Sequence, residues 1–167
     1  MTITADQLRD LVEAELSAVS DRRVLEHIQS LLVAPEPIMR AWDYGSDGEA
    51  YPCWTVLNHE RSNTGIAYCE SGFGPRAPWG LVFLGGSEPL SIGMDSAWFK
   101  RFLQAYFESK ASTELATWRV FRQDEGSSYP GVPVTEEASW DTTWQHVESL
   151  RAAHPDHRYH CEQSVYP

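Results

Sequence analysis

The feature that most constrains the fold is a central block, Tyr51 to Leu84, in which strand-like runs follow one another closely. Residues 51–57 and 65–69 are rich in aromatic and β-branched side chains, which favour a half-buried pleated strand. Six hydrogen-bonding side chains at 58–63 separate the two runs and predict a hairpin tip. Because loops held by a rigid sheet often carry recognition residues, this block indicates where a function would lie without naming a reaction.

Helical patterns flank this block on both sides. Thr4 and Gln7 form the two halves of a capping box for a first helix, and Asp21 caps a second one that Pro35 and Pro37 should end. The aromatic run Trp98 to Phe107 predicts a third helix, capped by Asp95 or Ser96, with a wide apolar face against the sheet. A fourth helix is expected at about 135–153.

Hairpin-connected strands dominate the rest of the chain. Besides the central runs, strands are predicted at 38–43, 79–84, 117–122 and 158–165. We therefore expect an α+β fold with a mostly antiparallel sheet of about five or six strands, on which two N-terminal and two further helices pack. At 167 residues the default is one domain over 1–167.

The cysteines and the N-terminal residues indicate the cellular compartment in which the protein is expected. Cys53, Cys69 and Cys161 cannot all pair within one chain, and none has CxxC spacing, which favours reduced thiols. The N-terminus lacks the basic and apolar stretches of a secretory signal, and no apolar run approaches the ~20 residues that span a bilayer. A cytoplasmic location is the expectation.

The charge balance restricts the partners. The chain has 24 acidic against 13 basic residues, a net charge of −11. Such a chain should be repelled by nucleic-acid phosphates and by anionic membranes, whereas a basic protein partner is allowed, because complementary charge speeds encounter. Acidity can also serve solubility alone.

The C-terminal segment gathers three imidazoles and a thiol, the side chains that zinc prefers. Their spacing does not match the short zinc motifs, and on a strand His160 and Cys161 would point to opposite faces. We therefore expect no metal site at His154, His157, His160 and Cys161 and no cofactor.

The hairpin tip holds the candidate catalytic residues. His59, Glu60 and Arg61, with Cys69 or Glu70 on the returning strand, could form an acid–base cluster. However, neighbours on an extended strand face opposite ways, and no nucleophile signature is present. We therefore favour a solvated turn or a binding loop at the hairpin tip, and catalysis there is the alternative.

Aromatic residues beside the turns are candidate partner contacts. Trp42, Tyr44 and Trp79 are expected to bind a partner together with His59 and Arg61, although a core role competes for the tryptophans. A small acidic chain without a catalytic signature resembles bacterial immunity and antitoxin proteins in composition. We therefore expect a module that neutralises or scaffolds a basic protein. The alternative is a small enzyme or ligand-binding domain that uses residues 58–70.

Overall fold

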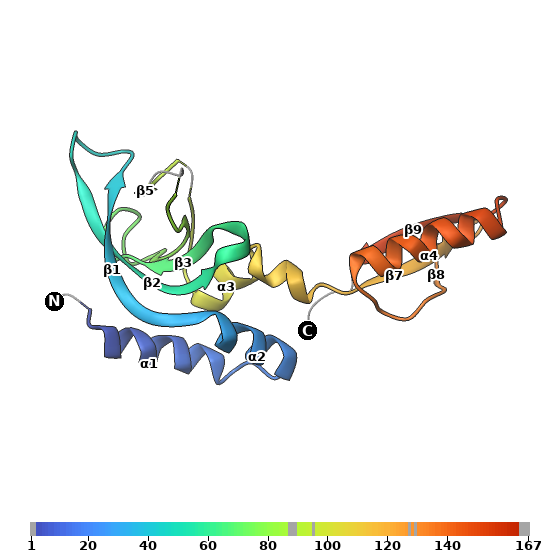
Figure 1. Cartoon of the computed structure of the whole chain (residues 1–167), viewed down its shortest axis with the longest axis horizontal. Coiled ribbons are helices and arrows are strands. Elements are labelled where there is room, and N and C mark those ends of the chain that lie inside the picture. The colour runs from blue at the N-terminus through green and yellow to red at the C-terminus, as the bar shows by residue number, and fades with distance from the viewer. Residues whose placement is uncertain (1–2, 87–89, 95, 127, 129, 164–167) are drawn as a thin grey trace. The chain divides into compact units, whose positions relative to one another are not determined.

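The computed structural model describes residues 3–86, 90–94, 96–126, 128 and 130–163. The chain forms two compact units, Met1–Glu114 and Leu115–Pro167 (Figure 1). The α+β class and the mostly antiparallel sheet are confirmed, and a second, three-stranded sheet is present in addition. The prediction of a single domain over the whole length stays a prediction.

The first unit is built on a six-stranded sheet with the strand order β5-β1-β2-β3-β4-β6. Only the short β1–β5 pairing is parallel among the described strands. Its elements, in chain order, are α1 (Ala5–Leu16), α2 (Arg22–Leu31), β1 (Leu32–Trp42), β2 (Ala50–His59), η1 (Glu60–Ser62), β3 (Thr64–Tyr68), β4 (Trp79–Phe83), β5 (Ser91–Ile92), β6 (Ala97–Phe99), α3 (Phe102–Phe107) and η2 (Ala111–Leu115).

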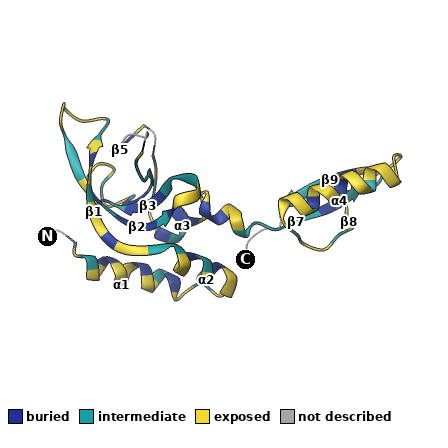
Figure 2. Cartoon of the chain, in the orientation of Figure 1, coloured by how far each residue is buried: buried dark blue, intermediate teal, exposed yellow. Residues whose placement is uncertain are grey.

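The two N-terminal helices form where the capping residues predict them. Thr4 and Gln7 make a reciprocal capping box at the start of α1, and the Asp21 carboxylate accepts a hydrogen bond from the Arg23 amide in α2. Buried positions alternate with exposed ones along both helices (Figure 2). This amphipathic pattern covers one face of the sheet, since α1 contacts β1, α2 contacts β2 and α3 contacts β3, β4 and β6.

Strand β1 is longer than predicted. It begins at Leu32, directly after α2, so Pro35 and Pro37 lie inside a strand and do not mark a loop after the helix. Prolines are tolerated here because, among the described residues, β5 pairs with β1 only at Ala41 and Trp42 and leaves the earlier part of β1 at the sheet edge.

The third helix is shorter than predicted. Trp98 lies in β6, which pairs with β4, and α3 begins only at Phe102. The aromatic spacing from Trp98 onward imitates a helical stripe, but its first part belongs to the sheet. Of the two expected caps, Asp95 lies outside the described residues, and Ser96 precedes β6 instead of a helix.

A β-bulge in β2 decides which side chains share a face. The pairing Thr55↔Ala67 is followed by Leu57↔Ile66, so Val56 is the extra residue in β2. One consequence is that Thr55 and Asn58, three positions apart, line the same pocket. We call the face that carries Thr55 and Cys53 the open face, and the face against α1, α2 and α3 the helix face.

The second unit is a three-stranded antiparallel sheet with one helix. Its elements are β7 (Trp118–Gln123), β8 (Val132–Pro133), α4 (Trp140–Ala153) and β9 (Arg158–Gln163), in the sheet order β8-β7-β9. Helix α4 packs on this sheet through Val147, which meets Val120 and Tyr159. It is capped by Ser139, so it starts later than predicted.

Within the part of the chain that the structure describes, no helix is long and apolar enough to cross a membrane.

Candidate functional site

The hairpin between β2 and β3 brings His59 to a buried position at the end of β2. Its side chain is on the helix face and the residue is 6% exposed. Residues Glu60 to Ser62 form one 3-10 turn, and Asn63 closes it in the left-handed conformation at φ 54°. Asparagine is one of the few residues that adopt this conformation at low cost, which explains its place at the end of the turn.

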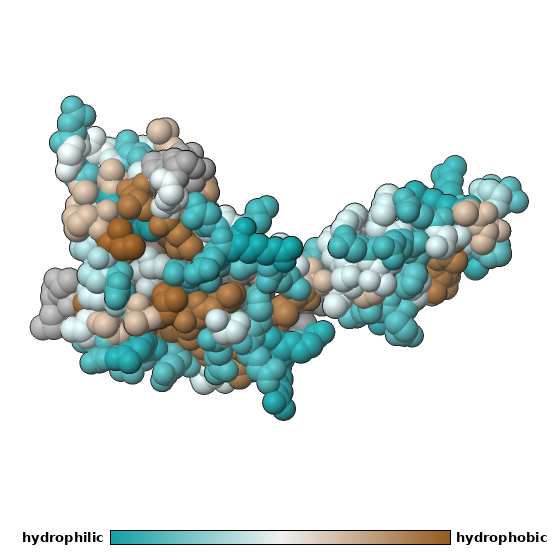
Figure 3. All heavy atoms as spheres, viewed as in Figure 1, coloured by the Kyte–Doolittle hydropathy of each residue, from teal (hydrophilic) through white to brown (hydrophobic). Residues whose placement is uncertain are grey.

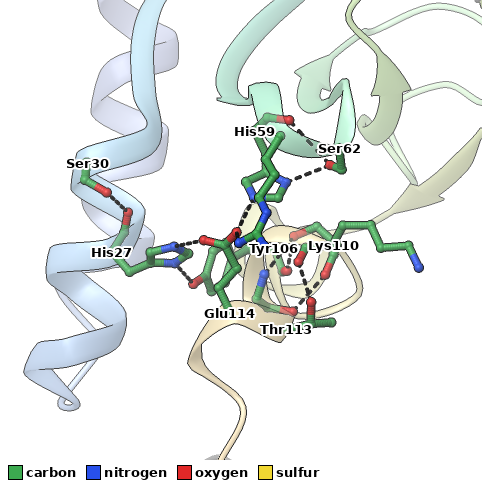
Figure 4. Close-up of polar contacts among 11 residues, drawn as sticks. His27, Ser30, His59, Ser62, Tyr106, Lys110, Thr113 and Glu114 are labelled. Atoms are coloured by element: carbon green, nitrogen blue, oxygen red, sulfur yellow. Dashed lines mark hydrogen bonds and ion pairs between the residues drawn. The ribbon is translucent and has the colours of Figure 1, made fainter. Parts of the chain in front are cut away.

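Both ring nitrogens of His59 have hydrogen-bond partners (Figure 4). Nδ1 lies 2.6 Å from the Ser62 hydroxyl, and Nε2 lies 2.9 Å from a carboxylate oxygen of Glu114. Ser62 in turn lies 2.6 Å from the Thr64 hydroxyl. The imidazole is therefore held between the turn and η2.

Glu114 joins three cationic or ionisable side chains. Besides His59, its carboxylate lies 3.4 Å from His27 Nε2 and accepts a hydrogen bond from Arg61 at 3.3 Å. His27 Nδ1 is 2.7 Å from the Tyr106 hydroxyl (Figure 4). The pKa of Glu114 is lowered below its ordinary value, mainly by the hydrogen bond with His59. The hydrogen bond with His27 and the positive charge of Arg61 contribute less. We call His27, His59, Arg61, Tyr106 and Glu114 the hairpin site.

The hairpin site differs in membership from the predicted catalytic cluster. His59, Glu60 and Arg61 line one pocket of about 520 Å³ with Glu114, whereas Glu70 is not among its lining residues. Sequence patterns did not single out the other three members, His27, Tyr106 and Glu114. No local pattern could have found Glu114, because it lies 55 positions from His59 and only the tertiary fold brings the two together.

The existing hydrogen bonds of His59 limit the chemistry that the hairpin site can perform. A general base needs a free lone pair within reach of a substrate proton, and both His59 nitrogens already lie at hydrogen-bond distance from protein atoms. Arg61 has an 84% exposed side chain and is the member that a ligand can reach most easily. The geometry fits a hydrogen-bonded cluster that connects α2, the hairpin and η2.

A second candidate surface consists of four aromatic residues on the open face. Phe73 meets Trp42 edge-on at a ring-centre distance of 5.1 Å and stacks on Trp98 at 5.6 Å, and Tyr44 lies edge-on to Trp42 at 5.2 Å. Tyr44 is 60% exposed and Phe73 39% exposed. We call these four residues the aromatic cluster.

Glycines allow the aromatic cluster to pack on the backbone. Gly72 has φ +71°, and a side chain there would press against the Trp42 ring at 3.1 Å. A Cβ at Gly80 in β4 would overlap the ring of Trp98, so glycine lets the indole lie on the strand. The Gly/Pro-rich segment after β3 therefore positions Phe73, which the sequence did not single out.

Two carboxylates accompany the aromatic cluster. Asp43 accepts a hydrogen bond from the Met94 amide at 3.0 Å. Glu49 accepts one from the Ser46 amide at 2.9 Å and another from the Tyr51 hydroxyl, which lowers the pKa of Glu49. Apolar rings beside fixed negative charges form a surface suited to basic and apolar groups.

Trp79 lies in the core and not at the surface where a partner contact was predicted. Its side chain is on the helix face, 3% exposed, with Tyr68 at 5.0 Å and Phe102 at 5.3 Å between ring centres. The strand begins at Trp79 as predicted, but this residue pairs with Tyr68 in β3 and its side chain is covered by Phe102 of α3. We exclude it from the candidate contacts.

Among the described residues, no group of three or more His, Cys, Asp and Glu side chains is placed to hold a metal ion. The C-terminal candidates are spread over different environments. His154 and His157 lie edge-on at 6.1 Å just after α4, and His160 stacks on Phe121 in β7.

Hydrophobic side chains also gather along the first half of β1 (Figure 3). Leu32, Val33 and Ala34 line a groove of about 280 Å³ with Val12 and Val56. Pro35, in the same groove, has no N–H to donate, which hinders the addition of a further strand at this edge.

We compared the chain with protein-family models, with curated proteins and with solved structures, and no match was found.

Proposed function

We propose that this chain is a protein-binding module whose aromatic cluster anchors a basic protein partner. The observation that carries the proposal is the exposure of Tyr44 and Phe73 within a preformed group of rings in mutual contact. Aromatic residues dominate the energy of protein interfaces because they bury a large area at a small entropy cost. Contacts between rings already fix their orientations before a partner arrives, which reduces the cost of binding.

The charge distribution supports a basic partner. The unit Met1–Glu114 has 16 acidic against nine basic residues, and Asp43 and Glu49 adjoin the cluster. Such a surface attracts a positively charged protein and accelerates association without adding much affinity. Neutralisation of a toxic basic enzyme, as immunity and antitoxin proteins perform it, is the form of this function that we favour.

A pull-down from the native cell with the full chain tests the proposal. We expect one or more basic proteins to be retained by the wild type and lost with the double substitution Tyr44→Ala and Phe73→Ala. The matched control is Phe107→Ala, since Phe107 is 40% exposed but lies at the end of α3, outside the cluster. Equal loss with the control, or equal retention with the double variant, would refute the aromatic cluster as the anchor.

A small-molecule function of the hairpin site is the second candidate. The observation that favours it is the pocket of about 520 Å³ that exposed Arg61 shares with buried His59. Its size is within the range of ligand pockets in proteins. A metabolite-extract screen by thermal shift, with Arg61→Ala as the comparison, would separate the candidates: stabilisation of the wild type alone favours a ligand of this pocket.

A further inference from the structure

A buried cation on the open face has no hydrogen-bond partner among the described residues. Arg40 in β1 is 0% exposed, and none of its three guanidinium nitrogens makes a hydrogen bond within the described part of the chain. Burial lowers the pKa of Arg40, yet an arginine keeps its charge in proteins. An uncompensated buried charge is strongly destabilising, so a negative group is expected close to it.

Two buried thiols lie on the same face of the sheet as Arg40. Cys53 is opposite Ile38 in the β1–β2 pairing, and Arg40 is two residues further along β1, on the same face. Cys53 and Cys69 belong to one buried cluster and are 0% and 1% exposed. The interaction with Cys69 and burial raise the pKa of Cys53, and the positive charge of Arg40 opposes that rise.

The two cysteines are cross-strand neighbours. The β2–β3 register ends with Trp54↔Tyr68, and the next pair in that register is Cys53 with Cys69. The Cys69 amide donates to the Pro78 carbonyl at 2.9 Å, so its backbone polar groups face away from β2. In such a non-hydrogen-bonded pair the Cα atoms are about 4.5 Å apart, which lies at the short end of the range that a disulfide spans.

We propose that Cys53 and Cys69 are a redox-sensitive pair that Arg40 activates and that hydrogen peroxide converts reversibly to a disulfide. The interaction between the two thiols lowers the pKa of Cys69 and raises the pKa of Cys53. Cys69 is therefore the attacking thiolate, and Cys53, whose ionised form Arg40 favours, is the thiol that resolves it. The carbonyl oxygen of Tyr51 accepts a hydrogen bond from the protonated Cys53 thiol at 3.7 Å.

The reaction balances with peroxide as the oxidant. The Cys69 thiolate attacks one peroxide oxygen, the O–O bond breaks, and sulfenic acid and hydroxide form; the hydroxide takes up the proton that the Cys69 thiol released on ionising and becomes water. The Cys53 sulfur then attacks the Cys69 sulfur, the S–O bond breaks, and the thiol proton and hydroxyl leave as water. Two thiols are oxidised and one peroxide is reduced to two waters. Peroxide is close to water in size and needs only a local opening beside Cys69, the residue that follows β3.

Peroxide treatment of the full chain followed by peptide mass spectrometry tests this inference. We expect the peptides of Cys53 and Cys69 to become linked with the loss of two hydrogen atoms, and dithiothreitol to reverse the link. Cys161 is an internal reference, since burial raises the pKa of its thiol, and it should react more slowly. Oxidation of Cys161 while the pair stays reduced would overturn the proposal.

Substitutions separate the roles of the three residues. Arg40→Met should slow the linkage at least about tenfold, whereas Arg40→Lys should retain most of the rate, because the attack of Cys53 on the oxidised Cys69 depends on its ionised form, which a nearby positive charge favours. In Cys53→Ser, dimedone should label Cys69; in Cys69→Ser, it should leave Cys53 largely unlabelled. An unchanged rate in folded Arg40→Met, or equal labelling of the two single cysteines, would contradict the mechanism.

Discussion

The two faces of the six-stranded sheet are covered in different ways. On the helix face, Ile66 in β3 and Trp79 in β4 lie under α3, and Phe102 is 0% exposed against Trp79. The buried cluster of the open face has no helical member among the described residues, and Trp42 and Trp98 pack against it. The helix face is therefore a folding core, whereas the open face retains exposed rings and a buried charge that folding alone does not require.

The largest expected effect is on the helix face. Phe102→Ala should lower the free energy of unfolding by about 3–5 kcal/mol, because it removes a fully buried ring next to Trp79. Urea denaturation measures the loss. A decrease below about 1 kcal/mol would mean that the packing of α3 contributes little, and the contrast between the faces would fail.

The hairpin site, at the edge of the helix face, should have a smaller and pH-dependent effect on the free energy of unfolding. The pKa of Glu114 is lowered in the folded state, so its ionised form stabilises the fold above the ordinary carboxyl pKa and loses that effect as the pH falls through the lowered value. Glu114→Gln should therefore cost about 1 kcal/mol or less at pH 7, given its 33% exposed side chain, and should flatten the decline below about pH 5.

Unfolding curves at several pH values measure this effect, with Glu60→Gln, an exposed carboxylate of the same hairpin, as the control. A wild-type decline no steeper than that of Glu114→Gln would show that the hydrogen bonds of Glu114 do not stabilise the fold.

On the open face, Arg40→Met should change the free energy of unfolding least. Replacement of a buried charge by an apolar side chain of similar length is often neutral or stabilising, and a nearby thiolate can regain its proton. We expect a change within about 1 kcal/mol in either direction, measured by urea denaturation. A loss above about 3 kcal/mol would show that Arg40 supports the fold and is no functional charge.

Local patterns in the sequence predicted most of the fold. The capping box of Thr4 and the aromatic and β-branched side chains of residues 51–57 specify their elements through neighbours in the chain. The start of β1 was missed, because Pro35 and Pro37 end helices and also suit an edge strand, and only tertiary pairing separates the two cases. Strand β6 was missed for a similar reason, since Trp98 continues the helical spacing of α3.

The candidate sites were only partly predictable. Tyr44 and Trp42 were chosen for their turn-flanking positions and lie in the aromatic cluster, whereas their neighbour Phe73 comes from a distant segment. The sequence offered one signal for Phe73, an apolar ring between two glycines in a bend. The buried position of Trp79 follows from the pairing of β4 with β3, which no local pattern contains.

The most direct test of the contrast between the faces is isothermal titration of the captured partner against two variants of the full chain. Tyr44→Ala with Phe73→Ala should weaken binding about thirtyfold or more, the effect of losing an interface hot spot, while its unfolding curve stays close to that of the wild type. Phe102→Ala, titrated at a temperature where it is folded, should bind within about threefold of the wild type. Wild-type affinity in the double variant, or a larger loss of affinity in Phe102→Ala, would contradict the assignment of binding to the open face.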